Sequence, residues 1–312
     1  MNATHSMTSA DTLALTRRVT LMSVATAVVL VSIKMAAWIA SDSTAMLASL
    51  ADSGLDLVAS LVTFFAVRYA AAPPDAEHRF GHGKAEAFAS LVQAGLVFAS
   101  AALIAREAVG DFLDPHPLQQ EGWAVAVMAV SIGLTLLLLR AQSAVLRQTS
   151  SVAVSGDRAH YASDLASNVV ALIGIGASAW LGVNGLDAAA ALIVAALLLW
   201  SAIGVFREAS SQLMDHELSD AARSDIVRLV TADGRLANVH QLRTRASGPF
   251  IHMQMHVDLD PDITLEAAHQ AIVAAENRIL EVFPAADILI HADPQGRAEP
   301  HGGAFAETNT PQ

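Results

Sequence analysis

The 312-residue chain contains no cysteine, which excludes disulfide bonds and any metal site built from thiolates. A bound metal ion must therefore be held by histidine, aspartate or glutamate, which argues against copper(I) and suits zinc, iron(II), cobalt or manganese. Basic residues are also scarce: 18 lysines and arginines stand against 30 acidic residues, and the formal net charge is −12. This balance argues against a nucleic-acid partner and suits a protein that attracts cations, although a solvated acidic surface is common.

Charged residues of both signs make up only 15% of the chain, and 54% of the residues are hydrophobic. A soluble protein carries more charge, about a quarter of its residues. The apolar residues form long runs before about residue 206, and the remainder has the composition of a soluble protein. The sequence therefore predicts one membrane domain followed by one soluble domain.

Six windows are apolar over the roughly 20 residues that a helix needs to cross a bilayer core. We place these transmembrane helices at residues 19–40, 45–68, 86–108, 122–142, 160–182 and 187–206. The first is too long for a cleaved signal peptide. The predicted organisation is a disordered N-terminus (1–15), a six-helix transmembrane domain (16–208), a cytoplasmic metal-binding α+β domain (209–295) and a disordered tail (296–312).

The connections between these spans alternate in charge. The 69–85 loop carries Arg79 and Lys84 and the 143–159 loop carries Arg147 and Arg158, whereas the other three connections carry no lysine or arginine. In membrane proteins, lysine and arginine are enriched in the cytoplasmic loops. This rule predicts that both termini and the soluble domain lie in the cytoplasm. The expected location is the cytoplasmic (inner) membrane, with the lipid bilayer as a partner.

The soluble part alternates between helix and strand patterns. A helix is expected at 219–232 with Ser219 as its N-cap, and a second helix is amphipathic. Strand composition and an SGP turn indicate a hairpin, followed later by a short third strand. This αββαβ order is typical of a small two-layer, ferredoxin-like α+β domain. The remaining elements are strands at 237–246 and 250–259, a helix at 264–283 and a strand at 286–291.

Two pairs of polar residues lie within the predicted spans. Asp52 and Asp56 are four residues apart in the second span, as are His160 and Asp164 at the start of the fifth. This spacing puts each pair on one helix face, and ionisable residues inside a membrane are costly and usually functional. A single aspartate near a helix end is more often a cap, but two such pairs can build a four-coordinate zinc-type site. Lys34 is a conceivable ion-pair partner, although we interpret it as snorkelling or packing locally.

These motifs resemble the cation diffusion facilitator family over about residues 15–295. The resemblance rests on the D-x-x-x-D and H-x-x-x-D pairs, on HRFGHGKAE at 78–86, HQLRTRASGP at 240–249 and LIHADP at 289–294. It implies a homodimer, exchange of the metal ion for protons, and a transport site at the four intramembrane residues.

The 69–85 loop holds Asp75, His78 and His82 within eight residues, a spacing that can fold around one ion. Solvated loop histidines are common, so the spacing alone leaves a ligand role open. The resemblance implies a second metal site on these three residues, which either tunes coupling or stabilises structure.

The soluble domain contains several histidines, and its acidic residues outnumber its basic ones. The resemblance implies a binuclear metal site there, but it gives His252 no ligand role. It also implies a charge contact between Lys84 and Asp215 near the membrane surface. The implied binuclear ligands are His240, His256, His269, His291 and Asp293.

The predicted function is therefore divalent metal efflux by proton antiport, with Zn²⁺ as the expected ion for transport and for the structural or regulatory sites. Fe²⁺, Cd²⁺, Co²⁺ and Mn²⁺ remain alternative ions. A membrane zinc enzyme would need a motif such as H-E-x-x-H, which the chain lacks. A membrane-anchored metal sensor or scaffold is the other class, although a sensor has no need of ligands within the membrane.

Overall fold

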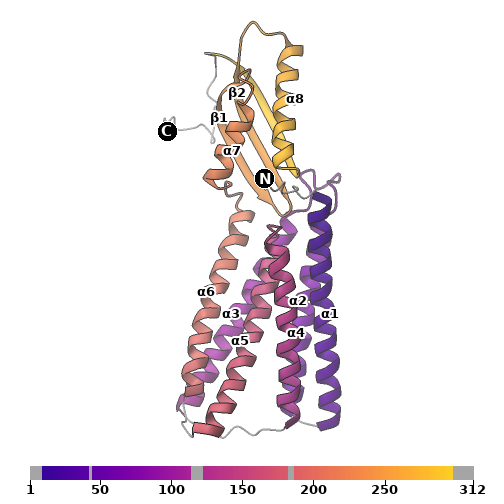
Figure 1. The fold of residues 1–312 in the computed structure, drawn as a ribbon, viewed down its shortest axis with the longest axis vertical. Coiled ribbons are helices and arrows are strands. Elements are labelled where there is room, and N and C mark those ends of the chain that lie inside the picture. The colour runs from indigo at the N-terminus through magenta and orange to yellow at the C-terminus, as the bar shows by residue number, and fades with distance from the viewer. Residues whose placement is uncertain (1–8, 42–43, 114–121, 182–185, 298–312) are drawn as a thin grey trace, which may run out of the picture. The chain divides into compact units, whose positions relative to one another are not determined.

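The computed structural model describes residues 9–41, 44–113, 122–181 and 186–297. The chain separates into two compact units. Of the described residues, those within Ala10–Leu213 form the first, here called the membrane unit, and residues 214–297 together with Ser9 form the second, here called the C-terminal unit. The ribbon in Figure 1 shows long helices in the membrane unit and a mixture of helices and strands in the C-terminal unit.

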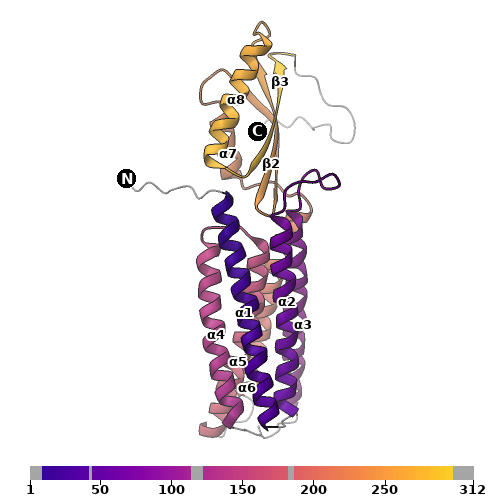
Figure 2. The same ribbon diagram turned by 90° about the vertical axis from the view of Figure 1, so that its right-hand side faces the viewer.

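Six helices make up the described part of the membrane unit (Figures 1 and 2). Five of them contain stretches long and apolar enough to cross a membrane. The exception is α5, whose first half carries Asp157, Arg158 and Asp164. The helices are α1 (Ser9–Ser41), α2 (Thr44–Ala70), α3 (Lys84–Leu113), α4 (Gly122–Leu146), α5 (Val152–Leu181) and α6 (Leu186–Leu213).

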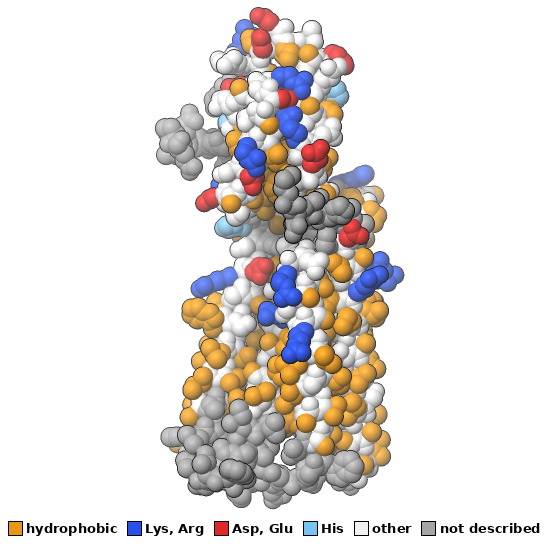
Figure 3. Space-filling view, in the orientation of Figure 1, with side chains coloured by type: hydrophobic (Ala, Val, Ile, Leu, Met, Phe, Trp, Pro, Cys, Tyr) orange, Lys and Arg blue, Asp and Glu red, His pale blue; other side chains and the backbone are white. Residues whose placement is uncertain are grey.

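The helices of the membrane unit pack through small and aliphatic side chains. Val97 and Ala101 of α3 meet Leu198 and Ala202 of α6 in one buried cluster. Small residues at such contacts let membrane helices approach closely. Many large apolar side chains remain exposed, for example Trp200, and hydrophobic side chains dominate the visible face of this unit (Figure 3). An exposed apolar surface of this extent suits helices that face lipid.

The C-terminal unit confirms the predicted αββαβ order. Strand β1 (Ala237–Ser247) pairs antiparallel with β2 (Phe250–Leu259), and β2 pairs parallel with β3 (Ala286–Pro294). Helices α7 (Asp220–Val230) and α8 (Leu265–Val282) lie on one face of the sheet (Figure 2). Alternate residues of β2 point into the core between sheet and helices, where Met253, Met255 and Val257 are buried.

Capping side chains explain where the two helices of the C-terminal unit begin. Ser219 accepts a hydrogen bond from the amide of Ala222, and Thr264 accepts one from Ala267. Such caps satisfy amides that have no partner within the helix. The predicted N-cap at Ser219 is therefore confirmed. The other face of the sheet, opposite the helices, presents the polar residues of β2.

Two helices begin eight or more residues earlier than the apolar windows predicted. Helix α1 begins at Ser9, so the expected disorder of residues 9–15 is wrong; Leu15 packs against Val19 and Val154 in a buried cluster. Helix α5 begins at Val152, eight residues before the predicted start of the fifth span. The remainder of the predicted disordered ends, 1–8 and 298–312, lies outside the described residues.

Candidate metal centres

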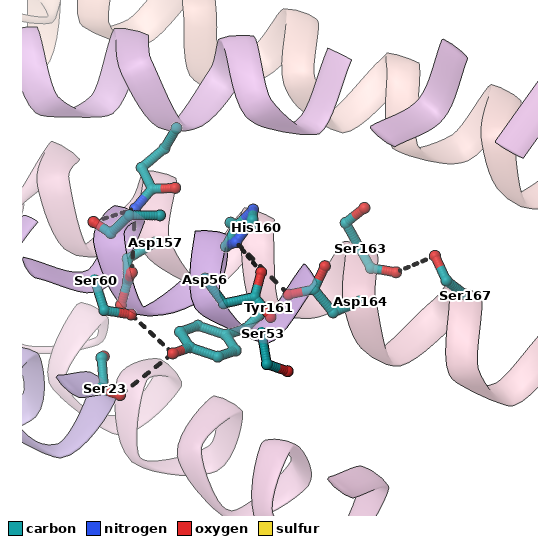
Figure 4. A network of polar contacts seen from close by, with 12 residues as sticks. Ser23, Ser53, Asp56, Ser60, Asp157, His160, Tyr161, Ser163, Asp164 and Ser167 are labelled. Atoms are coloured by element: carbon teal, nitrogen blue, oxygen red, sulfur yellow. Dashed lines mark hydrogen bonds and ion pairs between the residues drawn. The ribbon is translucent and has the colours of Figure 1, made fainter. Parts of the chain in front are cut away.

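The first candidate centre lies between α2 and α5 inside the membrane unit. His160 Nε2 is 3.0 Å from Asp56 Oδ1 and 3.7 Å from Asp164 Oδ2. Figure 4 shows that both carboxylates point toward the imidazole. One possible ligand atom from each residue lies within 4.8 Å of the others, a spacing that one metal ion can span. We call these three residues the intramembrane cluster.

The intramembrane cluster is buried within the helices. Only 4% of His160 and 6% of Asp56 is exposed. His160 Nδ1 and Asp164 Oδ2 have no hydrogen-bond partner among the described residues. Buried polar atoms normally have partners, so unpartnered ligand-type atoms at one place point to a bound cation. Two carboxylates and one imidazole provide donors that suit zinc or a similar divalent ion.

Asp52, the fourth predicted ligand, lies outside the intramembrane cluster. It sits one helical turn before Asp56, and its side chain is exposed. Its predicted role as a ligand stays a prediction. Lys34 is buried on α1 and donates hydrogen bonds to Ser53 Oγ at 2.6 Å and to the Ser49 carbonyl oxygen at 3.1 Å. This local packing against α2 agrees with one of the two interpretations drawn from the sequence.

The second candidate centre lies in the loop between α2 and α3, and it contains all three predicted residues. Asp75 Oδ1 accepts hydrogen bonds from the backbone amides of His78, at 2.6 Å, and Glu77, at 2.9 Å. Asp75 Oδ2 lies 3.1 Å from His82 Nε2. The two imidazole rings are 4.6 Å apart, and Tyr69 packs 4.4 Å from the His82 ring. The loop thus brings two imidazoles and a carboxylate together.

Hydrogen bonding also sets the charge state of this loop centre. The backbone amide of His78 is the main cause of a lowered pKa of Asp75, because it stabilises the carboxylate form. His82 is buried, and its Nδ1 atom has no hydrogen-bond partner among the described residues. An ionised carboxylate beside an unpartnered imidazole nitrogen is a donor set suited to zinc.

The third candidate centre lies on the sheet face opposite α7 and α8. His240, His256 and Asp293 offer ligand atoms within 4.8 Å of one another. His256 Nδ1 is 2.8 Å from Asp293 Oδ2, and His240 Nε2 is 3.5 Å from the same oxygen. His291 Nε2 is 3.3 Å from Asp293 Oδ1. These four side chains line one end of the sheet face and offer donors for a zinc-type ion.

Strand register brings these residues together from three strands. His256 pairs directly with His240 on one side and with His291 on the other. The β1 ladder is irregular on both sides of His240, and the backbone is left-handed at Asn238 and Gln241. These irregularities change the direction of the strand beside the cluster. Bulges of this kind are frequent next to functional sites.

Asp293 is the shared carboxylate of the third centre. Burial acts to raise the pKa of Asp293, but the hydrogen bond from His256 and the neighbouring histidines lower it below the usual range. Asp293 is therefore an ionised acceptor at neutral pH. An ionised carboxylate shared by three imidazoles is a favourable position for a cation.

Asp258 is a neighbour that the sequence reasoning missed. It pairs with Asp293 across β2 and β3, and its Oδ1 lies 3.3 Å from His240 Nε2. Its Oδ2 accepts a hydrogen bond from Asn238 at 2.9 Å. The available signal was strand alternation, because Asp258 follows His256 by two residues and so lies on the same face.

Three other predicted positions lie elsewhere. His269 is exposed on α8, outside the described cluster, and its ligand role stays a prediction. Lys84 donates to the Leu213 carbonyl oxygen at 3.3 Å within the membrane unit. Asp215 pairs with Arg245 at 3.1 Å within the C-terminal unit. A contact between Lys84 and Asp215 would join the two units, and it stays a prediction.

The helices and the intramembrane cluster define a multi-pass membrane protein with metal-ligand groups inside and outside its helices. Residues 20–214 match the family described as "Cation efflux transmembrane domain", and residues 218–295 match "Cation efflux protein, cytoplasmic domain". The chain belongs to this cation efflux family, the cation diffusion facilitators, as its motifs predicted. It is a membrane transporter of metal cations and not an enzyme.

Two cation-efflux pumps agree with this family assignment. The cation-efflux pump FieF of Salmonella arizonae is 37% identical over 280 residues, which cover 90% of this chain and 93% of that protein. FieF of Klebsiella pneumoniae subsp. pneumoniae is 39% identical over the same shares. A solved structure of the zinc form of CzrB is 27% identical, covers 27% of this chain and 98% of its own, and has a TM-score of 0.25.

Proposed function

We propose that this transporter carries zinc out of the cytoplasm, across the cytoplasmic membrane, in exchange for protons. The observation that carries the proposal is the buried cluster of Asp56, His160 and Asp164 between two membrane helices. Ionisable groups at such a depth are expensive and mark ion pathways. The names of the FieF relatives, cation-efflux pumps, support the outward direction.

The choice of zinc rests on the donor atoms. An imidazole with carboxylates suits zinc, whereas harder sites made only of oxygen favour manganese or magnesium. Iron(II), cadmium, cobalt and manganese are the competing ions. A transport assay with a panel of these ions decides among them. If the protein prefers one of them over zinc, the proposed metal is wrong but the proposal that the protein is a metal transporter stands.

Proton exchange follows from the chemistry of the ligands. A carboxylic acid and an imidazolium must each lose a proton to become the carboxylate and neutral imidazole that bind metal, so metal and protons compete for the same atoms. The imidazole of His160 can hold either a metal ion or a proton, which makes it a suitable exchange group. In an alternating-access cycle the cluster binds metal when open to the cytoplasm and releases it to protons when open to the exterior.

The loop centre and the C-terminal centre are proposed as resident metal sites with regulatory or structural roles. Both lie outside the membrane-spanning stretches and carry imidazole and carboxylate donors. The name of the family model that matches the cytoplasmic domain, ZT_dimer, supports a homodimer, in which metal held on the sheet face would join two copies. The excess of positive charge in alternate loops supports cytoplasmic termini.

Zinc uptake by proteoliposomes with an imposed pH gradient tests the transport proposal. Asp164→Ala is expected to abolish uptake, because it removes a carboxylate that lies 3.7 Å from His160. Asp225→Ala, which removes a half-exposed carboxylate from α7, is the control and should transport normally. Normal transport by Asp164→Ala, or transport indifferent to the pH gradient, would refute the mechanism. Zinc binding without any transport would favour a sensor or scaffold.

A further inference from the structure

A second buried carboxylate lies one helical turn before His160 on α5. Asp157 is only 1% exposed. Its Oδ1 accepts a hydrogen bond from Gln93 Nε2 at 3.2 Å, and its Oδ2 accepts one from Gln142 Nε2 at 2.8 Å. A buried carboxylate is stable only with such partners, so its two oxygens tie α5 to α3 and α4.

The two glutamines extend these bonds to further helices. Gln93 also donates to Thr63 Oγ1 of α2 at 2.8 Å, and Gln142 also donates to Ser23 Oγ of α1 at 3.2 Å. Asp157 is therefore the centre of a buried polar network that joins the five helices from α1 to α5. Figure 4 shows Asp157 beside the intramembrane cluster.

A second anchor follows His160 directly. Tyr161 is buried, and its hydroxyl donates to the Ser23 carbonyl oxygen at 3.2 Å while it lies 2.8 Å from Ser60 Oγ. His160 is thus placed between two residues of α5 that bond to other helices. A rotation of α5 about its axis, or a shift along it, would break both sets of bonds.

Close backbone packing restricts the same part of α5. A Cβ atom at Gly156 would lie 2.9 Å from Ser90 Oγ, 3.1 Å from Gln93 Cβ and 3.2 Å from Ser90 Cα. These separations leave no room for a side chain, so α3 and α5 approach closely beside Asp157. Tight packing and directed hydrogen bonds together define one position for the helix segment that carries the ligands.

We propose that Asp157 is a positioning residue of the transport site, whose bonds to Gln93 and Gln142 set the rotation and depth of α5. Through α5 it places His160 and Asp164 opposite Asp56. Asp157 does not belong to the group of ligand atoms within 4.8 Å of one another in the described residues, and both its oxygens accept from amides. This inference rests on the proposed function, because it takes the intramembrane cluster to be the transport site.

The proposal can be tested in the full-length transporter by moving the carboxylate from position 157 on α5 to position 142 on α4 and the amide in the opposite direction. Gln142→Glu alone places a carboxylate against Asp157, and like charges at that distance repel. Adding Asp157→Asn restores the pair with reversed polarity, because the new amide can donate to Glu while its oxygen still accepts from Gln93. The double variant therefore keeps the bonds but moves the charge from α5 to α4.

Zinc transport in proteoliposomes provides KM and kcat for each variant. Asp157→Ala and Gln142→Glu are each expected to raise KM for zinc by about tenfold, the lower end of the loss seen when groups that orient metal ligands are removed. The double variant is expected to return KM toward the wild-type value. Ser131→Ala, which removes a buried α4 hydroxyl that donates to the Val127 carbonyl oxygen of its own helix, is the control and should leave KM unchanged.

The outcomes separate this inference from the proposed function. If Asp164→Ala is inactive but Asp157→Ala and Gln142→Glu keep the wild-type KM, the positioning role is wrong and the transport site stands. If the double variant is as defective as Gln142→Glu, the charge on α5 itself is required and the positioning role is again wrong. If Asp157→Ala does not fold, the comparison of Gln142→Glu with the double variant still tests the positioning role. Normal transport by Asp164→Ala overturns the proposed function itself.

Discussion

At the scale of single residues, each candidate centre pairs an imidazole with a carboxylate. The pairs are Asp56 with His160, Asp75 with His82, and Asp293 with His256. A carboxylate beside an imidazole fixes the orientation of the ring and stabilises a cation at the same place. The three pairs lie between two membrane helices, in a loop and on a sheet. The same combination of ligands therefore occurs in three different kinds of secondary structure.

Asp75 offers a test of the loop centre that separates its two oxygens. Asp75→Asn keeps the oxygen that accepts the amides of Glu77 and His78 but puts an NH₂ group opposite His82. The loop should therefore keep its turn, while zinc affinity at this centre falls by at least about tenfold because an anionic ligand is lost. Zinc titration of the purified transporter, with the Asp164→Ala and Asp293→Ala changes in the background, isolates this centre.

The neighbouring Glu77 supplies the control for that titration. Glu77→Gln removes one negative charge from the same exposed loop but leaves every side-chain contact of Asp75 in place. Its zinc affinity should match that of the parent. Equal losses in Asp75→Asn and Glu77→Gln would mean that the loop attracts zinc by net charge alone, against a defined centre.

Sequence reasoning identified ligand types better than ligand geometry. The spacing of His160 and Asp164 is a helix property, so their shared face was predictable. The meeting of His240 with His256 depends on a strand register with irregularities on both sides of His240, which no local pattern reveals. Asp52 lies on the same helix face as Asp56, but a spacing of four residues does not determine whether both carboxylates reach the same site.

At the scale of elements, the first residue of α5 shows that a hydropathy window locates the apolar part of a helix and not its true start. The window began at residue 160 because Ser155, Asp157 and Arg158 are polar, but the helix begins at Val152. These residues belong to the helix since Asp157 finds partners on α3 and α4, and Arg158 donates to Ser143 Oγ at 3.0 Å. Partners distant in sequence therefore extended the helix, whereas the C-terminal unit followed local caps and alternation closely.

The contact between α3 and α5 provides a test at this scale. Gly156→Ala should force the two helices apart, because the added methyl group would meet the Ser90 backbone at 3.2 Å. Overpacking of this kind costs about 1–3 kcal/mol. The change should lower the thermal unfolding temperature of the transporter in nanodiscs and reduce zinc transport.

Gly95→Ala is the matched control on α3. A Cβ atom at Gly95 would have no neighbour within 4 Å among the described residues, and alanine also favours a helix over glycine by up to about 1 kcal/mol. Gly95→Ala should therefore leave unfolding unchanged or raise its temperature. Equal behaviour of the two alanine variants would show that α3 and α5 do not approach as closely as the structure indicates.

At the scale of the whole molecule, the chain divides its chemistry between two units. The membrane unit holds apolar helices around the intramembrane cluster, and the C-terminal unit presents an imidazole and carboxylate face on its sheet. Copies of an acidic domain repel each other, and a divalent ion bound at a shared face reduces that repulsion. Zinc binding and self-association should therefore be coupled.

This coupling predicts that zinc favours the dimer. A ligand that binds one state better than another stabilises that state in proportion to the logarithm of its concentration. Asp293→Ala removes the carboxylate that contacts His256 at 2.8 Å and His291 at 3.3 Å, so it should weaken the zinc effect. Asp287→Ala, on the same strand and the same face, removes an equal charge but only the contact with His252. Sedimentation of the detergent-solubilised protein, with zinc and with a chelator, measures the monomer and dimer fractions. Zinc should raise the dimer fraction in the wild type and in Asp287→Ala but much less in Asp293→Ala, and the same response in both variants would place the coupling outside the third centre.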